Sequence, residues 1–248
     1  MNLFSLFPKR KQSVDNYFEL ITEENNGNPY SFDKRYMNQE TKLLKIYGSS
    51  NTYNKKIKMI VISDTHNCLN ENEFKCFMEQ HKEYDVCILL GDHSSYDISK
   101  ILKYIDKNKT YGLLGNHDYN YLEEYNINNL NGKIININGT TILGMQGSFK
   151  YKPSNFPSFT QRESILFLND KSSVDILISH DNSFDNNMLK NPAHQGLFGI
   201  TYYLYKNKVS YHIHGHIHNP YEKKLLNGTK EISVYMYEYL ELSNETKE

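Results

Sequence analysis

Residues 57–66 read IKMIVISDTH, an unbroken apolar run that stops at Asp64-Thr65-His66. Continuous β-branched runs of this kind, without polar alternation, are typical of a strand that is buried on both faces of a parallel sheet. Two further runs have the same form: residues 85–90 (DVCILL) lead into Gly91-Asp92-His93, and residues 110–114 (TYGLL) lead into Gly115-Asn116-His117-Asp118. Each run therefore predicts a buried strand that ends in polar residues.

Segments with apolar residues at helical spacing separate these strands, over residues 71–82 and 95–106. The alternation of strands and helices predicts a parallel, right-handed βαβαβ start. The second half is richer in strands, because Asn138-Gly139-Thr140 predicts a hairpin between residues 133–137 and 141–143. The remaining expected elements are strands over residues 174–179, 209–214 and 231–239 and a helix over residues 196–206. The expected fold class is α/β with mixed sheets.

The first 55 residues differ from this pattern. Residues 14–22 predict a short helix, but residues 23–29 (EENNGNP) are a cluster of helix breakers and residues 48–56 are polar. We expect residues 1–55 to form an N-terminal extension that is partly irregular, and residues 56–248 to form the main domain.

The composition argues against several classes of protein. With 28 basic and 29 acidic residues the formal net charge is −1, so no global positive field would hold a nucleic-acid backbone. No run approaches the roughly 20 apolar residues of a membrane-spanning helix. The cysteines, Cys68, Cys76 and Cys87, give neither a disulfide framework nor a structural zinc motif. These features suit a cytoplasmic protein without a membrane span.

Polar residues recur wherever a predicted buried strand ends. Besides the three blocks above, residues 174–179 run into His180-Asp181, and residues 209–214 run into Gly215-His216-Ile217-His218. Ligands of open α/β sheets bind at the carboxyl ends of the strands. Five strands therefore bring polar side chains to one edge, and seven of these could bind a metal ion: Asp64, His66, Asp92, Asn116, His180, His216 and His218.

The spacing of these residues suits a pair of cations. Asp64 and His66 are two residues apart, as are His216 and His218, so in extended backbone both members of a pair point the same way. Seven ligands are too many for one ion, whereas two ions that share Asp92 would use them all. Carboxylate, imidazole and amide groups without a thiolate favour Mn, Fe, Co, Ni or catalytic Zn.

Taken singly, the blocks have ordinary explanations. A helix cap explains Asp64-Thr65-His66, and turns explain Gly91-Asp92 and Gly115-Asn116-His117-Asp118. Five such blocks in order at five strand ends are much harder to explain in that way.

Some histidines have a structural explanation that is as good or better. His212 and His214 precede Gly215 on a strand and are expected to be structural. His93 is as consistent with a loop role as with the site, and His194 is as consistent with capping or solvent as with contact to a substrate.

Together the five blocks resemble the calcineurin-like metallophosphoesterase family, whose pattern is D-x-H, G-D, G-N-H-[E/D], H and G-H-x-H. The resemblance covers roughly residues 57–240 and implies an αββα sandwich with mixed sheets. It also implies a phosphatase or phosphodiesterase with a binuclear metal centre. Manganese is the favoured metal, with Fe, Zn, Ni and Co as alternatives.

The resemblance further implies a role for each residue. Asp92 would bridge the two ions, and a hydroxide between them would attack phosphorus in line with the leaving oxygen. His117 would act as general acid, contributing about 10²–10⁴-fold to the rate. The remaining implied ligands are Asp64, His66 and His218 for the first ion and Asn116, His180 and His216 for the second.

The sequence departs from the family pattern after Asp92. The family often has a second aspartate three residues later, which orients the catalytic histidine. Ser95 occupies that position here, and Asp97 or Asp118 could substitute. The Asp-Arg-Gly of protein serine/threonine phosphatases is also absent, which argues against a dedicated phosphoprotein phosphatase.

The leading hypothesis is therefore a phosphomonoesterase or phosphodiesterase that acts on a small or exposed phosphate ester, such as a cyclic nucleotide. The first alternative is a DNA or RNA nuclease of the same fold, which the neutral charge disfavours. The second is a non-catalytic, metal-stabilised scaffold, against which His117 and the seven ligand positions argue.

Overall fold

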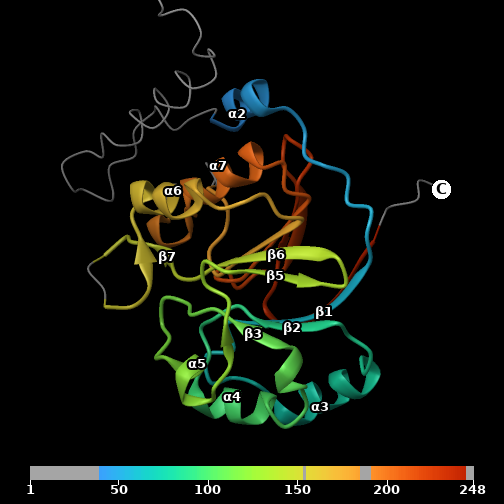
Figure 1. Ribbon diagram of the computed structural model, residues 1–248. Helices are drawn as coiled ribbons and strands as arrows, with labels where there is room; N and C mark the ends of the chain where they lie inside the picture. The colour runs from blue at the N-terminus through green and yellow to red at the C-terminus, as the bar shows by residue number, and fades with distance from the viewer. Residues whose placement is uncertain (1–38, 153–154, 185–190, 244–248) are drawn as a thin grey trace, which may run out of the picture.

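The computed structural model describes residues 39–152, 155–184 and 191–243. The helix expected over residues 14–22 lies outside them. The described chain forms two main sheets with helices outside each, so the layers run helix, sheet, sheet, helix (Figure 1). This arrangement confirms the expected αββα class with mixed sheets.

The first sheet has five strands in the order β13-β1-β2-β3-β4. Strands β1, β2 and β3 are parallel, with Met59 opposite Val86 and Cys87 opposite Thr110, which confirms the predicted βαβαβ start. The strand bounds are β1 (Ile57–Ser63), β2 (Val86–Leu89), β3 (Thr110–Gly112), β4 (Asn128–Asn129) and β13 (Met236–Leu242).

Three helices lie on the outer face of this sheet: α3 (Glu71–Gln80), α4 (Ser95–Ile101) and α5 (Tyr121–Glu124). Asn70 caps α3 by accepting hydrogen bonds from the amides of Asn72 and Glu73. Helix α4 ends at Ile101, so the helix expected to continue to residue 106 was predicted too long. The side chain of Asp106 instead caps a separate 3₁₀ turn, Lys107–Lys109, by accepting from the amide of Asn108.

The second sheet has six strands in the order β11-β12-β10-β9-β6-β5. The predicted hairpin is confirmed, because Ile134 pairs with Leu143 and both Asn138 and Gly139 adopt a left-handed backbone in the turn. The strand bounds are β5 (Ile134–Ile137), β6 (Thr140–Met145), β9 (Ile176–Ser179), β10 (Tyr211–His214), β11 (Tyr221–Lys224) and β12 (Lys230–Ser233).

Further elements cover the outer face of the second sheet and one end of it. Helix α6 (Gln161–Asn169) packs against α7 (Phe198–Lys206), and a 3₁₀ turn, Pro192–His194, precedes α7. A separate two-stranded sheet pairs β7 (Ser148–Phe149) with β8 (Ser158–Phe159). Within the described ranges, every helix is too short or too polar to cross a bilayer.

The single strand expected over residues 231–239 was predicted wrongly. The segment forms two strands in different sheets: β12 pairs with β10, and β13 pairs with β1. Met236 has a φ of 65°, and a left-handed residue of this kind interrupts an extended run. The chain therefore crosses from one sheet to the other between Ser233 and Met236.

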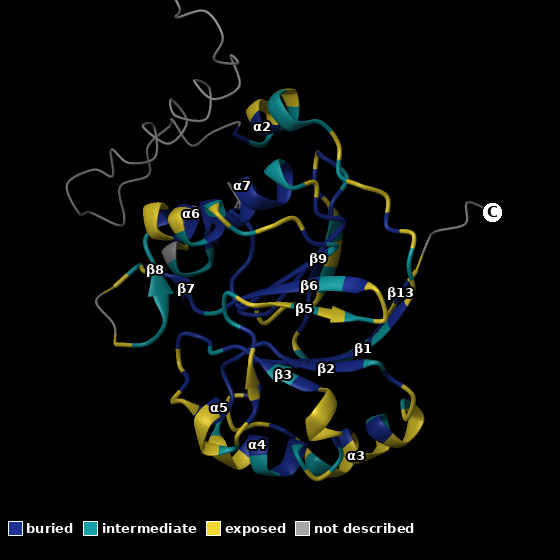
Figure 2. Cartoon of the chain, in the orientation of Figure 1, coloured by how far each residue is buried: buried dark blue, intermediate teal, exposed yellow. Residues whose placement is uncertain are grey.

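The core consists of three layers of apolar side chains. Successive residues of β1 alternate between two of them: Met59 and Val61 face the second sheet, whereas Ile60 and Ile62 face helices α3 and α4. Because both faces of β1 are covered, all of its residues except Lys58 are buried, and the strand is mostly dark blue in Figure 2. Burial on both faces explains why the strand reads as a continuous apolar run.

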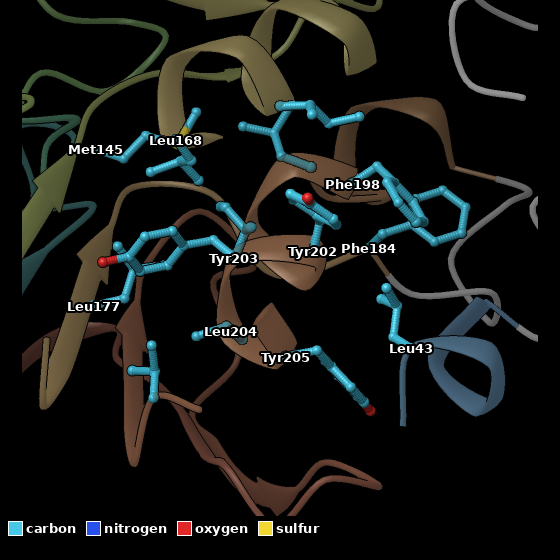
Figure 3. Packing of buried hydrophobic residues seen from close by; sticks show 14 of the residues in the cluster. Leu43, Met145, Leu168, Leu177, Phe184, Phe198, Tyr202, Tyr203, Leu204 and Tyr205 are labelled. Atoms are coloured by element: carbon cyan, nitrogen blue, oxygen red, sulfur yellow. The ribbon is translucent and has the colours of Figure 1, made fainter. Parts of the chain in front are cut away.

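Residues 39–55 contact the main domain closely. Helix α2 (Gln39–Tyr47) lies against α7, and Leu43 is fully buried in the cluster that contains Phe198 and Tyr202 (Figure 3). Tyr205 donates a hydrogen bond to Glu40 at 2.8 Å. We therefore propose that residues 39–55 fold together with the domain that begins at residue 56.

We expect Leu43→Ala to lower the free energy of unfolding by about 2–4 kcal/mol, because it leaves a cavity under α7. Urea denaturation followed by circular dichroism measures this change. Lys42→Ala is the matched control, since Lys42 is exposed on the same helix. Equal stability of the two variants would contradict the proposed docking of α2.

Candidate metal centre

The polar residues that follow five strands meet between the two sheets. Asp64, Asp92 and Asn116 follow β1, β2 and β3, while His180 and His216 follow β9 and β10. A hydrogen bond joins the sheets here, because the amide of His216 donates to Asp64 Oδ2 at 2.8 Å. The structure therefore brings the predicted residues of both halves of the chain into one place.

Two groups of side chains in this place could hold a metal ion. The first is Asp64, His66 and His218, and the second is Asp92, His180 and His216. In the first group, His218 Nε2 lies 3.3 Å and His66 Nε2 lies 3.8 Å from Asp64 Oδ1. Asn116 joins the second group, since its Oδ1 is 3.0 Å from His180 Nε2.

Asp92 lies between the two groups. Its Oδ2 atom is 3.6 Å from His66 Nε2 and also 3.6 Å from His180 Nε2. Two ligands that each lie about 2.1 Å from one cation cannot be more than about 4.2 Å apart. The position of Asp92 Oδ2 thus suits an atom that contacts a cation on either side.

Two buried oxygens at the centre have no hydrogen-bond partner in the described structure, Asp64 Oδ1 and Asp92 Oδ2. They are the same atoms that face the histidines of the two groups. Leaving a buried carboxylate oxygen unsatisfied is costly, and a coordinated cation removes this cost. The residues present therefore fit a pair of divalent cations.

The backbone at the ligand positions is not extended as expected. Asp64, His66, Asp92, His216 and His218 all have φ between 42° and 67°, in the left-handed region. The strands end just before these residues, and the chain then turns sharply. The side chains of the candidate ligands project from these turns. Non-glycine residues rarely adopt this conformation, and such strained positions are concentrated at functional sites.

Glycines permit the close approach of the strand ends. A Cβ atom on Gly115 would overlap the carboxylate of Asp92, and a Cβ atom on Gly215 would overlap the Ser63 hydroxyl and lie 2.5 Å from Asp64 Oδ2. Since a side chain at either position would displace a buried carboxylate, glycine is required there.

The electric field of the site is set by its buried carboxylates. Burial alone would raise the pKa of Asp64, but the close contact with His218, the nearby His180 and the hydrogen bond from Ser63 hold this pKa well below its usual range. Burial tends to lower the pKa of His180, yet the charges of Asp92 and Asp64 raise it. The close contact with Asp64 likewise raises the pKa of His218.

Asp118 has a structural position at the centre of the loops. Its carboxylate accepts hydrogen bonds from the amides of Asp92, His93 and Gly115, at 2.6–2.7 Å. Burial and the neighbouring charge of Asp92 raise the pKa of Asp118 to about 7. Asp118 thus holds two ligand loops together and does not orient His117.

His117 lies at the exposed mouth of the site. Its amide donates to Asp92 Oδ1 at 2.8 Å, and its ring centroid is 5.8 Å from that of His66. Among the described residues, no carboxylate is hydrogen bonded to this ring. Ser95 bonds to Glu124 instead, and Asp97 lies beside Lys100.

The other histidines differ in their surroundings. His93 is buried, with Nδ1 bonded to the Thr65 hydroxyl at 3.0 Å, so it is not an exposed loop residue. The ring of His194 packs edge-on against His216, which places it beside the site. His212 and His214 lie in β10 and contact Glu231, in agreement with a structural role.

Sequence reasoning singled out no role for Asp181. This fully buried carboxylate accepts from the amide of Phe149 at 2.7 Å and lies 4.0 Å from His216 Nε2. Burial raises the pKa of Asp181. Its only signal in the sequence is its place directly after His180.

A small pocket adjoins Asn116. Its lining is polar and basic, with Lys150 and Lys152 at the rim and Ser148, Phe149, Tyr151 and Ser158 around them. Tyr119, which is 82% exposed, stacks edge-on against Phe156 near His117. Cationic and aromatic groups therefore flank the candidate metal groups.

The family model for calcineurin-like phosphoesterases matches residues 57–220, well over half of the chain. The chain therefore belongs to the calcineurin-like phosphoesterase family. None of the curated proteins matches this sequence.

Solved structures share the fold at low sequence identity. A Thermus thermophilus protein is 10% identical with a TM-score of 0.53, over 76% of this chain and 99% of that one. A phosphopantetheinyl hydrolase from Mycobacterium tuberculosis is 13% identical with a TM-score of 0.53, over 76% and 91%. A 5'-nucleotidase from Candida albicans is 12% identical with a TM-score of 0.50, over 75% of this chain and 47% of that one.

We expect Gly115→Ala to weaken metal binding by at least about 10-fold, because the new methyl group displaces Asp92. Calorimetric titration of chelator-treated protein with Mn²⁺ measures the affinity. The control is Gly139→Ala in the β5–β6 turn, where a Cβ would meet no atom within 4 Å, so that it strains a left-handed turn without touching the metal groups. Unchanged Mn²⁺ affinity in the Gly115 variant would contradict the placement of Asp92 at the metal centre.

Proposed function

We propose that this chain is a metal-dependent phosphoesterase that hydrolyses phosphate mono- or diesters at a dinuclear centre. Asp92 is shared between the ions in this proposal. The observation that carries it is the pair of unsatisfied buried oxygens, Asp64 Oδ1 and Asp92 Oδ2, each facing imidazole nitrogens. The other ligands are Asp64, His66 and His218 for one ion and Asn116, His180 and His216 for the other.

The donor set supports the choice of metal. Carboxylate, imidazole and amide oxygen without thiolate suit manganese first, with Fe, Zn, Ni or Co as alternatives. When bound, such a pair of cations lowers the pKa of a water and withdraws charge from the phosphoryl oxygens. The chain itself must then orient the ester and supply a proton to the leaving group.

His117 is the residue placed to supply that proton. It is exposed at the mouth, and its backbone is fixed because its amide is bonded to Asp92. The ring thus lies beside the metal groups without being a ligand of either. No carboxylate of the described ranges is bonded to the ring, which instead lies near the rings of His66 and Phe156.

The surroundings of the site support a small or exposed ester as substrate. Lys150 and Lys152 lie at the rim of the pocket beside Asn116, where they would attract a second anionic group of the substrate. The structural relatives include enzymes named for nucleotide and phosphopantetheinyl substrates, and such phosphorylated metabolites are consistent with this rim.

We expect His117→Ala to lower kcat by about 10²–10⁴-fold, since the leaving group loses its proton donor. Turnover of nitrophenyl phosphate and bis(nitrophenyl) phosphate with added Mn²⁺ measures this effect. The metal content of the variant stays at the wild-type value, whereas His180→Ala loses metal.

Three other results would contradict the proposal in different ways. No turnover of any ester by the wild-type protein, with several divalent metals, would favour a non-catalytic scaffold. Salt-sensitive cleavage of single-stranded DNA, without turnover of small esters, would favour a nuclease. Wild-type kcat in His117→Ala would remove the general acid from the mechanism.

We expect Lys150→Ala and Lys152→Ala to raise KM about 2–5-fold for an ester that carries a second phosphate, because an exposed ion pair contributes up to about 1 kcal/mol. KM for nitrophenyl phosphate stays unchanged, since it has no second anion. The control is Lys133→Ala, since Lys133 is exposed and lies directly before β5. Equal effects on both substrates would contradict the assignment of the pocket.

A further inference from the structure

A second polar cluster lies on the outer face of the six-stranded sheet, behind the candidate metal groups. Its centre is Glu231, which is fully buried on β12 and lies opposite His212 of β10 and Lys223 of β11. Glu231 Oε2 is 2.8 Å from His212 Nδ1, and Oε1 is 2.9 Å from Lys223 Nζ and 3.2 Å from the Tyr221 hydroxyl. The proposed chemistry does not use this carboxylate.

The first arm of the cluster reaches the loop that carries His180. His212 Nε2 lies 2.6 Å from the Ser179 hydroxyl, and that hydroxyl lies 2.6 Å from the carbonyl oxygen of Asp181. Ser179 and Asp181 flank His180 in sequence. The chain of contacts therefore runs from Glu231 to both sides of a proposed metal ligand.

The second arm reaches the loop that carries His216 and His218. The Tyr221 hydroxyl, beside Glu231, lies 3.0 Å from His214 Nε2. His214 Nδ1 in turn lies 2.8 Å from the carbonyl oxygen of Gly215, the residue before His216. One buried carboxylate is thus linked, through two histidines, to both metal-bearing loops of this sheet.

The donors and acceptors of the first arm follow from the geometry of its contacts. Two oxygens 2.6 Å apart repel unless a hydrogen lies between them, so the Ser179 hydroxyl donates to Asp181 O. The Ser179 oxygen then accepts from His212 Nε2, while His212 Nδ1 donates to Glu231. His212 therefore links the Ser179 hydroxyl to Glu231 through its two ring nitrogens.

Stability alone does not explain a carboxylate at this position. Although burial raises the pKa of Glu231, the hydrogen bond from His212 and the charge of Lys223 hold it well below its usual range. Replacing a buried ion pair of this kind by apolar residues is often neutral or stabilising. What apolar residues would not reproduce is the directed contact with the two loops.

We propose that Glu231 is a positioning residue of the metal centre, which holds the loops carrying His180 and His216 in place through His212 and His214. This inference rests on the proposed metal centre. Its effect falls more on the group of His180 and His216, because both residues lie on the linked loops. Of the other group only His218 lies on such a loop, whereas Asp64 and His66 follow a strand of the other sheet. Partners behind metal ligands typically contribute 10–100-fold to metal affinity.

The test is Glu231→Gln in the full chain. Glutamine keeps the size of the side chain but turns an N–H₂ group toward donors that need an acceptor. Mn²⁺ is titrated calorimetrically into chelator-treated protein, and circular dichroism confirms that each variant is folded at the temperature used. We expect one of the two Mn²⁺ binding steps to lose about 10–100-fold in affinity, while the other step changes less.

Two further variants complete the design. Ser179→Ala removes only the contact with Asp181 and leaves the His212–Glu231 pair in place. It therefore tests the proposal even if Glu231→Gln does not fold. We expect Ser179→Ala to lower the Mn²⁺ affinity of the same binding step by a smaller factor. Glu222→Gln, an exposed neighbour on β11, is the control and binds Mn²⁺ as the wild type does.

The outcomes separate the two levels of the proposal. If the wild type binds two Mn²⁺ ions and both Glu231→Gln and Ser179→Ala bind them equally well, the positioning role is overturned while the metal centre stands. If the wild-type protein binds no divalent ion, the metal centre itself is wrong, and the role of Glu231 falls with it.

Discussion

Negative charge buried between two sheets is the constraint on which this structure depends. Asp64 and Asp92 are almost fully inaccessible, and each has an oxygen without a hydrogen-bond partner in the described structure. Such charge is tolerated in a protein interior only where donors or cations surround it. The amides around Asp118, the imidazoles at the strand ends and the glycines between them all serve this requirement.

The two sheets contribute differently to the site. The five-stranded sheet supplies the carboxylates and the amide, through Asp64, Asp92 and Asn116, and the six-stranded sheet supplies imidazoles, through His180 and His216. Neither sheet alone holds a complete ligand group, and the bond from the His216 amide to Asp64 fixes their relative position. The geometry of the candidate site therefore depends on how one sheet packs against the other.

Much of the fold was predictable because a strand that is buried on both faces has a continuous run of apolar residues in its sequence. β1 and β2 read as unbroken apolar runs, and the polar residue after each run marked the ligand edge. The gap between β12 and β13 left no such mark, since Val234 and Tyr235 suit a strand as well as any neighbour. Only pairing with distant strands divides that segment between sheets.

The roles of individual side chains were harder to predict than the fact that these side chains lie together at one site. In the sequence, Ser95 occupies the position of the family's second aspartate, and Asp118 was one candidate to replace that aspartate. The observed role of Asp118 instead follows from three backbone amides that come together only in the folded loops. Glu231 carries no local signal, because its partners lie 19 and 8 residues away on neighbouring strands. The left-handed backbone at Asp64 and His66 likewise has no signature in residue type.

β13 pairs with β1 in antiparallel register along its whole length, from Leu242 opposite Ile57 to Met236 opposite Ser63. A ribosome delivers β1 about 180 residues before this partner, and synthesis proceeds at roughly 5–20 residues per second. For that interval the nascent chain carries an apolar strand with one open edge, of the kind that invites pairing with another polypeptide. Closure of the sheet around Asp64 therefore has to wait for the synthesis of β13.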